Sequence, residues 1–150
     1  MALYYLETSA LVKLYVRESG TDLLLRLVAR TNDHRFAVLA LARIEFRSAI
    51  RRRAREGDID SGVAKQLLDR FDQHLETMFE CQGVGDSVID VACSLVDRYP
   101  LRAYDAVQLA GCLALKTSSA GDDPTFVCSD RKLIEAAQSE GLEVIDPSAP

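Results

Sequence analysis

Apolar and polar positions change their spacing several times along the chain, and each change predicts an element. Short apolar runs such as ALYYLE predict strands, whereas longer segments with apolar residues three or four positions apart predict helices. The predicted strands are residues 2–7, 36–39, 79–84, 125–128 and 143–145. The predicted helices are residues 9–17, 22–30, about 40–56, about 61–78, 86 or 87 to 99, 104–115 and 131–139. The polar run TSSAGDDP is the clearest predicted loop.

The order of these elements predicts the fold class. Strands that alternate with helices favour parallel βαβ units, so we expect an α/β fold in which helices cover both faces of a doubly wound, mainly parallel sheet of four to five strands. Thr8 or Ser9 is the expected N-cap of the first helix, and Gly57 is expected to end the helix that starts near residue 40. That helix and the next are expected to form an antiparallel hairpin.

Length and composition limit the classes of protein to consider. The 150 residues are expected to form one domain, residues 1–150, with a substantial hydrophobic core. The hydrophobic fraction of 48% and the charged fraction of 27% are typical of a soluble globular protein. The start, MALYYLETSAL, has no basic region and no small-residue cleavage site, so we expect no signal peptide, and no stretch approaches the length of a membrane span.

The cysteines indicate a reducing compartment. Four cysteines are widely spaced, form no CxxC pair and stand in apolar contexts. We therefore expect buried free thiols in a cytoplasmic protein rather than a disulfide or zinc framework. The four positions are Cys81, Cys93, Cys112 and Cys128.

The net charge of −5 by itself argues against broad electrostatic binding of nucleic acid. The charge is unevenly distributed, however, because six arginines lie in one predicted helix and form a local basic surface. They are Arg43, Arg47, Arg51, Arg52, Arg53 and Arg55. Four of them, spaced by four residues from Arg43 to Arg55, form a stripe that is either a solvated helix surface, a contact for RNA phosphates or a docking surface for a partner.

Four acidic residues each stand where an apolar segment begins or ends. They are Glu7, Glu45, Asp105 and Asp130. Carboxylates are costly to bury unless they are paired or bind a cation, and two of them about 4 Å apart repel by roughly 4 kcal/mol at an effective dielectric constant near 20. A shared divalent cation would offset that repulsion. Oxygen ligands suit Mg²⁺ or Mn²⁺, and with only two histidines in the chain an imidazole-based site is not expected.

Each acid also has a purely structural explanation. Glu7 can be the acid that favours a helix start, and Glu45 can form an ion pair with a nearby arginine. Asp105 and Asp130 can each cap the helix that follows, and for Asp130 this explanation is the strongest of the four. Only their occurrence together favours a metal site.

Four motifs in this order resemble a known family. They are YYLETSALVKLY, ARIEFRSAI, LRAYDAVQLA and FVCSDRKLIEAAQSEGLEV, which together span nearly the whole chain. The combination resembles the PIN domain, and specifically the VapC-type toxin ribonucleases of bacterial and archaeal toxin–antitoxin pairs. The resemblance implies a PIN-like three-layer α/β/α fold and a metal-dependent endoribonuclease. It also implies that Glu7, Glu45, Asp105 and Asp130 line one acidic pocket that holds one or two Mg²⁺ or Mn²⁺ ions.

Further residues and partners follow from the same resemblance. Ser9 matches the family's hydroxyl near the metal, and Ser129 matches the small polar residue beside the last aspartate. A cognate antitoxin is implied, with a segment lying across the pocket, and a homodimer is expected. From spacing alone, Arg52 lies two helical turns from Glu45 on nearly the same face, and Arg102 lies one turn before Asp105, where it would pair with a carboxylate or approach the substrate.

The expected reaction is hydrolysis of an RNA phosphodiester by a metal-activated water. The sequence departs from the family at Glu7, where the usual residue is aspartate. The extra methylene can be absorbed by the rotamer or backbone, can shift the metal toward Asp105, or can impair activity. We expect activity to be retained because the other three acids and TSALVKLY are intact. The alternatives are a catalytically weak PIN-fold binding protein and a receiver- or phosphatase-like α/β protein that holds Mg²⁺ at a phosphoryl group.

Overall fold

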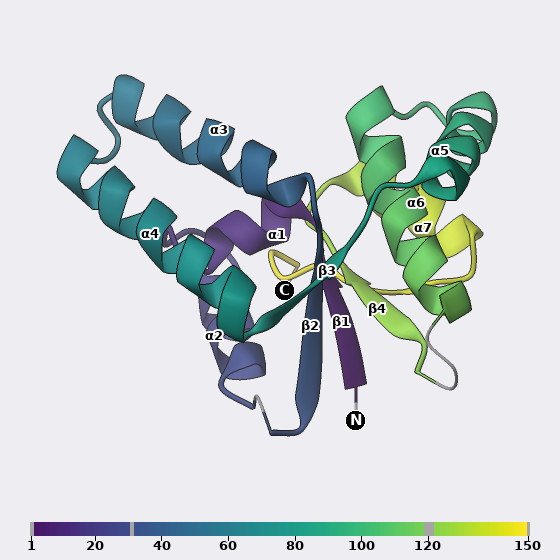
Figure 1. The fold of residues 1–150 in the computed structure, drawn as a ribbon, viewed down its shortest axis with the longest axis horizontal. Coiled ribbons are helices and arrows are strands. Elements are labelled where there is room, and N and C mark those ends of the chain that lie inside the picture. The colour runs from purple at the N-terminus through teal and green to yellow at the C-terminus, as the bar shows by residue number, and fades with distance from the viewer. Residues whose placement is uncertain (1, 31, 119–121, 150) are drawn as a thin grey trace.

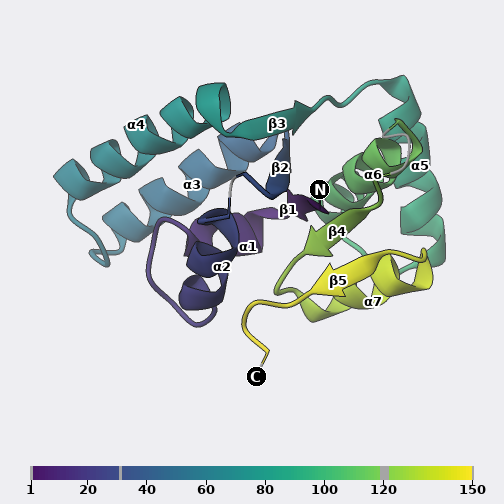
Figure 2. The ribbon, with the colours of Figure 1, turned by 90° about the horizontal axis from the view of Figure 1, so that it is seen from below.

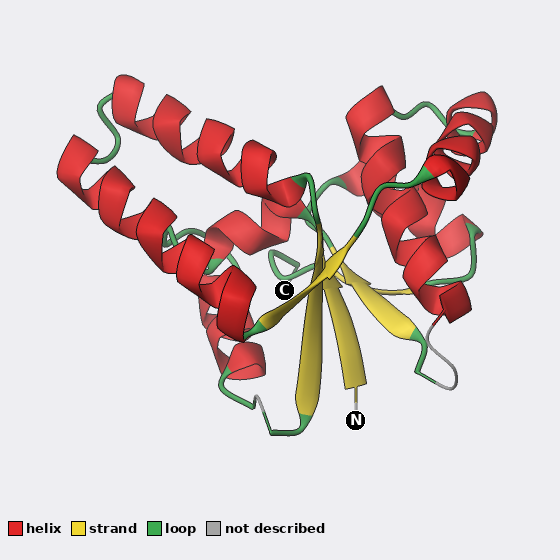
Figure 3. Ribbon diagram, viewed as in Figure 1, coloured by secondary structure: helices red, strands yellow, loops and turns green. Residues whose placement is uncertain are grey.

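The computed structural model describes residues 2–30, 32–118 and 122–149 of the chain. Five strands form one sheet in the order β3-β2-β1-β4-β5, and every neighbouring pair is parallel (Figure 1). The strands are β1 (Ala2–Leu6), β2 (His34–Leu39), β3 (Phe79–Gln82), β4 (Pro124–Val127) and β5 (Glu143–Ile145). Helices flank the sheet on both faces (Figure 3), which confirms the predicted three-layer α/β/α fold.

The helices are α1 (Thr8–Lys13), α2 (Thr21–Val28), α3 (Ala42–Arg55), α4 (Ser61–Thr77), α5 (Asp86–Arg98), α6 (Ala103–Ser118) and α7 (Arg131–Ser139). The first helix is shorter than predicted, because it already ends at Lys13 with Leu14 as its C-cap. The predicted cap at Thr8 or Ser9 is wrong, since the carboxylate of Glu7 takes this place. The predicted loop TSSAGDDP begins later than expected because α6 continues to Ser118, and residues 119–121 lie outside the described residues.

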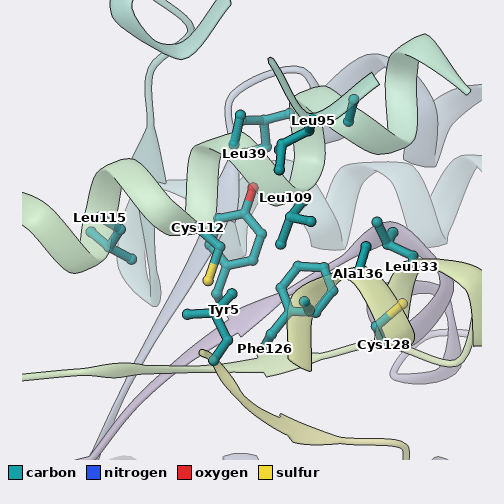
Figure 4. Packing of buried hydrophobic residues seen from close by; sticks show 14 of the residues in the cluster. Tyr5, Leu39, Leu95, Leu109, Cys112, Leu115, Phe126, Cys128, Leu133 and Ala136 are labelled. Atoms are coloured by element: carbon teal, nitrogen blue, oxygen red, sulfur yellow. The ribbon is translucent and has the colours of Figure 1, made fainter. Parts of the chain in front are cut away.

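Period-two alternation along the strands divides the apolar side chains between two cores. In β1, Leu3 and Tyr5 face the core that is closed by α5, α6 and α7, whereas Leu6 belongs to the core that is closed by α1 to α4. Figure 4 shows the first core, where Tyr5 and Phe126 stack with ring centroids 5.8 Å apart beneath residues of α6 and α7. Because successive strand side chains point to opposite faces, one buried sheet supports both cores.

The α3–α4 hairpin extends beyond the sheet (Figure 1), and Figure 2 shows it on the side away from α5 and α6. Phe46 of α3 and Phe71 of α4 are fully buried between the two helices, with ring centroids 4.3 Å apart. Gly57, at φ +82°, follows α3 in the left-handed conformation that glycine adopts most easily. The prediction of an antiparallel hairpin is confirmed.

Helix α6 lies unusually close to the sheet. A Cβ atom on Gly111 would lie 2.6 Å from Leu39 Cδ1 and 2.8 Å from the Tyr5 hydroxyl oxygen, so a larger residue would force these side chains or the helix to shift. This close contact positions the middle of α6, the helix that also carries Asp105, relative to β1 and β2.

The cysteine prediction is only half correct. All four cysteines are free, and Cys112 and Cys128 are buried, but Cys81 and Cys93 are exposed. Cys81 lies on β3, which is an edge strand, and Cys93 lies on α5. Among the residues that the structure describes, no helix combines the length and apolar character that a membrane crossing requires.

Candidate active site

The four predicted acids come from four segments that meet at one edge of the sheet. Glu7 directly follows β1, and Asp130 follows β4 after two intervening residues. Glu45 lies in the first turn of α3, which follows β2, and Asp105 lies in the first turn of α6. Because β1, β2 and β4 are parallel, their carboxyl ends share this edge, where ligands bind in open α/β sheets. Figure 1 shows these ends pointing toward the start of α1 and α3.

Glu7 is the most buried of the four acids, with 5% of its surface exposed. Its Oε2 atom accepts a hydrogen bond of 3.0 Å from the backbone N–H of Ser9 and a second, short one from the Ser9 hydroxyl. The pKa of Glu7 is raised to about 7, mainly by burial and to a smaller extent by the charge of Glu45, while the hydrogen bonds from Ser9 oppose the rise. The fold therefore disfavours the charged form of this carboxylate, and a bound cation would reverse that effect.

Glu45 is half-buried and is held by neutral donors. Gln108 Nε2 lies 3.4 Å from Glu45 Oε1 and also donates to the hydroxyl oxygen of Thr8 at 2.9 Å. Burial raises the pKa of Glu45, hydrogen bonds from Thr8 and Gln108 lower it, and the charge of Asp105 raises it. None of the ion pairs among the described residues involves Glu45, although the arginines near it in sequence pair with Asp72 and Glu18.

The four acids Glu7, Glu45, Asp105 and Asp130 form what we call the acidic row, and Asp105 and Asp130 lie at the end away from Glu7. Burial raises the pKa of half-buried Asp105, the charge of Asp130 raises it further, and Arg102 opposes both. Asp130 is exposed, and its Oδ1 accepts a 3.1 Å hydrogen bond from the backbone N–H of Leu133. Asp130 is therefore the N-cap of α7, as its structural explanation predicted, and it also lies near Asp105.

The four acids line two adjoining cavities that share Glu45. Glu7 and Glu45 line a cavity of about 550 Å³, and Glu45 also lines a second cavity of about 410 Å³ together with Asp105 and Asp130. Glu45 therefore lies between Glu7 on one side and the two aspartates on the other. Within residues 2–30, 32–118 and 122–149, no three His, Cys, Asp or Glu side chains come close enough together to surround one ion.

The two predicted serines have different surroundings. The Ser9 hydroxyl donates to Glu7 and accepts a 3.0 Å hydrogen bond from the backbone N–H of Ser129. The Ser129 hydroxyl instead lies 3.2 Å from the Ser148 hydroxyl near the C-terminal end. Ser9 thus contacts the acidic row with its side chain, whereas Ser129 supports it through its backbone.

Basic side chains surround the cavities. Arg52 lines the larger cavity and Arg102 lines the smaller one, where both were expected. The larger cavity also contains an ion-pair cluster that sequence reasoning missed, in which Glu18 lies 3.0 Å from both Lys13 Nζ and Arg53 Nη2. Lys13 belongs to the TSALVKLY motif, but the sequence offered no signal that it pairs with a residue beyond the end of α1.

Two further neighbours of the acids were not expected. Gln108 is fully buried and accepts a 3.2 Å hydrogen bond from the Tyr5 hydroxyl, so it connects Tyr5, Thr8 and Glu45. Its position three residues after Asp105 in LRAYDAVQLA, one turn along the same helix, was a usable signal. The buried Cys128 thiol lies beside Glu7 and accepts a 3.3 Å hydrogen bond from the backbone N–H of Asp130.

The donor set has the chemistry of a hard-cation site. It consists of carboxylate and hydroxyl oxygens, which Mg²⁺ and Mn²⁺ prefer. Both histidines lie elsewhere, His34 at the start of β2 and His74 near the C-terminal end of α4. Three of the four acids have raised pKa values, which a bound cation would reverse.

Comparison with known proteins identifies the family. The PIN domain profile matches residues 4–139. Ribonuclease VapC46 of Mycobacterium tuberculosis is 35% identical over 150 residues, which cover 99% of this chain and 100% of that protein.

Two solved structures have a similar fold. One is PAE2754 from Pyrobaculum aerophilum, with a TM-score of 0.66, 20% identity and coverage of 95% of this chain and 83% of that one. The other is a toxin–antitoxin complex from Klebsiella pneumoniae, with a TM-score of 0.65, 14% identity and coverage of 96% and 97%. The profile match over residues 4–139 and the 35% identity to VapC46 show that the chain belongs to the PIN domain family.

Proposed function

We propose that this protein is a Mg²⁺- or Mn²⁺-dependent endoribonuclease, the toxin of a toxin–antitoxin pair. The observation that carries the proposal is the row of four carboxylates at the carboxyl edge of the sheet, three of them with raised pKa values. Such a row is unfavourable without a cation, and it occurs in a chain that is 35% identical to a protein named as a ribonuclease.

The residues proposed to hold the ion are Asp105 and Glu45, with Glu7 beside them and Asp130 as an outer or water-mediated ligand. A divalent cation held there would lower the pKa of a bound water and would stabilise negative charge on the phosphate. No nucleophilic side chain is required.

The other residues orient these acids and the substrate. Thr8 and Gln108 hold Glu45 without adding charge, and Ser9 holds Glu7. Arg52, which lines the larger cavity, and Arg102, which lines the smaller one, are the residues proposed to contact phosphates of the substrate. The cavities thus offer a path for a single RNA strand across the acidic row.

Asp105→Asn tests the site directly. Incubation of the purified protein with structured RNAs and Mg²⁺ or Mn²⁺ is expected to produce cleavage that EDTA abolishes. The Asn variant keeps the shape of the side chain but loses its charge, so we expect cleavage to fall by at least a hundredfold. Asp90→Asn, which changes an exposed acid on α5, is the matched control and is expected to cleave like the wild type. Cleavage that survives in Asp105→Asn would refute the proposed site.

A second candidate function rests on Glu7. Its carboxylate already caps α1 and bonds to Ser9, so it is engaged in local structure. If this leaves the protein a catalytically weak PIN-fold binding protein, Glu7→Asp is expected to raise cleavage strongly. Unchanged or lower cleavage in Glu7→Asp would favour a competent natural site.

The proposed partners are an antitoxin and a second copy of the chain. A solved structure with the same fold is described as a toxin–antitoxin complex, which supports the first. Expression together with the product of a small neighbouring reading frame, followed by light scattering, would measure both. We expect a homodimer that binds the antitoxin and then no longer cleaves RNA.

A further inference from the structure

Tyr104 carries a hydroxyl group that the fold does not use. Among the described residues, only Tyr104 Oη and His34 Nδ1 are buried side-chain polar atoms without a hydrogen-bond partner. His34 lies at the amino end of β2, far from the acids, whereas Tyr104 lines the cavity that contains Glu45, Asp105 and Asp130. An unpaired buried hydroxyl destabilises a protein, so its presence at this place needs another explanation.

The surroundings of Tyr104 suggest an acceptor. Burial raises the pKa of Tyr104 strongly, and Glu45 is the charge that raises it most, followed by Glu7. The phenol therefore keeps its proton and can act only as a neutral donor to these acids. Its oxygen is closed off from solvent, so a bound ligand cannot reach it unless a neighbouring group moves. Glu45 is half-buried and lines the same cavity as Tyr104, and its hydrogen bond from Gln108 is long, at 3.4 Å, although Thr8 donates a second one.

We propose that Tyr104 is a positioning residue of the acidic site, whose hydroxyl donates a hydrogen bond to the Glu45 carboxylate when the site binds its divalent cation. The bond fixes one carboxylate oxygen so that the other faces the ion, as outer hydrogen bonds to metal ligands commonly do. This inference rests on the proposed function. It adds a residue outside the four acids and explains why a destabilising hydroxyl lies beside them.

Tyr104→Phe removes only this hydroxyl, and three measurements separate the possible roles. In EDTA, the thermal unfolding midpoint is expected to stay the same or rise, because no hydrogen bond is lost. With Mn²⁺ alone, the Kd from electron paramagnetic resonance of the free ion is expected to rise roughly tenfold, as for other outer partners of metal ligands. RNA cleavage is expected to fall by a similar factor at a fixed, subsaturating Mn²⁺ concentration.

Tyr15→Phe is the matched control. The Tyr15 hydroxyl lies 2.6 Å from His74 Nδ1, and its side chain lines a different cavity. This variant is expected to show the reverse pattern, with a lower unfolding midpoint and an unchanged Kd for Mn²⁺. A double variant tests whether Tyr104 acts through Glu45. If it does, adding Tyr104→Phe to Glu45→Gln should weaken Mn²⁺ binding no further.

Two results would overturn the proposal. One is a Kd for Mn²⁺ in Tyr104→Phe within twofold of the wild type, and the other is a fall in the unfolding midpoint like that of Tyr15→Phe. If the wild type binds Mn²⁺ and cleaves RNA while Tyr104→Phe does both equally well, only the role of Tyr104 fails. If the wild type neither binds Mn²⁺ nor cleaves RNA, the proposed function fails and this inference with it.

Discussion

Glu7 combines two tasks at the scale of the single residue. It ends β1, caps α1 through Ser9, and points its carboxylate toward the larger cavity. Only 5% of its surface is exposed, so its charge is strongly disfavoured without a cation. One side chain therefore links the start of a helix to the chemistry of the site.

The raised pKa of Glu7 predicts how stability depends on pH. Its pKa rises from 4.5 to about 7 on folding, so between these values the folded state binds more protons than the unfolded state. Stability is therefore lost as the pH rises through this window, by at most about 3 kcal/mol from this group. The raised pKa values of Glu45 and Asp105 add to the same trend.

Glu7→Gln isolates this effect, because glutamine keeps the shape and an acceptor for Ser9 but does not titrate. We expect the free energy of unfolding in EDTA to fall more steeply for the wild type than for Glu7→Gln between about pH 5 and pH 7.5. Urea unfolding at several pH values measures both curves. Parallel curves for the two proteins would show that Glu7 does not have the raised pKa.

Asp130 belongs to the scale of the element, because it begins α7 as well as ending the acidic row. Asp130→Ala removes the acceptor for the Leu133 N–H and is expected to destabilise the protein by about 1 kcal/mol. Asp130→Asn keeps a good N-cap and is expected to change the free energy of unfolding by only a few tenths of about 1 kcal/mol.

Urea unfolding measures the stability of the two Asp130 variants, and RNA cleavage tests whether Asp130 also acts in the acidic site. If the charge of Asp130 supports the site, cleavage falls in both variants, although only Asp130→Ala is less stable. Cleavage that follows stability alone would limit Asp130 to capping.

Helix α3 shows how much of an element the sequence could predict. Its length, its end near Gly57 and its pairing with α4 followed from apolar spacing and turn residues. The contact of Glu45 with Gln108 did not, because these residues are 63 positions apart and meet only when α3 and α6 pack on the same edge. Likewise, local sequence favoured Thr8 or Ser9 as the cap of α1, because Ser and Thr are preferred N-caps, whereas in the structure Glu7 is the cap.

At the scale of the whole molecule, charge is distributed unevenly. The net charge is −5, yet α3 carries six arginines next to the acidic cavities. Arg43 and Arg47 lie 3.9 and 3.7 Å from the same aspartate, Asp72 of α4, so this carboxylate only partly offsets the stripe. The stripe is therefore a candidate contact for RNA phosphates, separate from Arg52 in the larger cavity.

Replacing two arginines of α3 tests this surface. RNA binding in EDTA, measured by fluorescence anisotropy at several salt concentrations, is expected to weaken in Arg51→Gln/Arg55→Gln. The slope of log K against log salt should decrease by about 1.4, because each phosphate contact on a single strand contributes about 0.7. Arg26→Gln/Arg30→Gln, which removes equal charge on and just after α2, is the control and should keep the slope. Equal loss in both double variants would indicate only a general charge effect.

The sequence by itself determined the order and type of the elements, the parallel α/β class and the four acids. These depend on local spacing and on residue chemistry, which can be read from neighbouring residues in the sequence. Tertiary structure decided which groups meet: Glu45 between two cavities, Gln108 against Thr8 and Glu45, and the Tyr104 hydroxyl without a partner. Burial, which sets the raised pKa values, also arises only when segments distant in sequence pack together, so no local pattern could have predicted it.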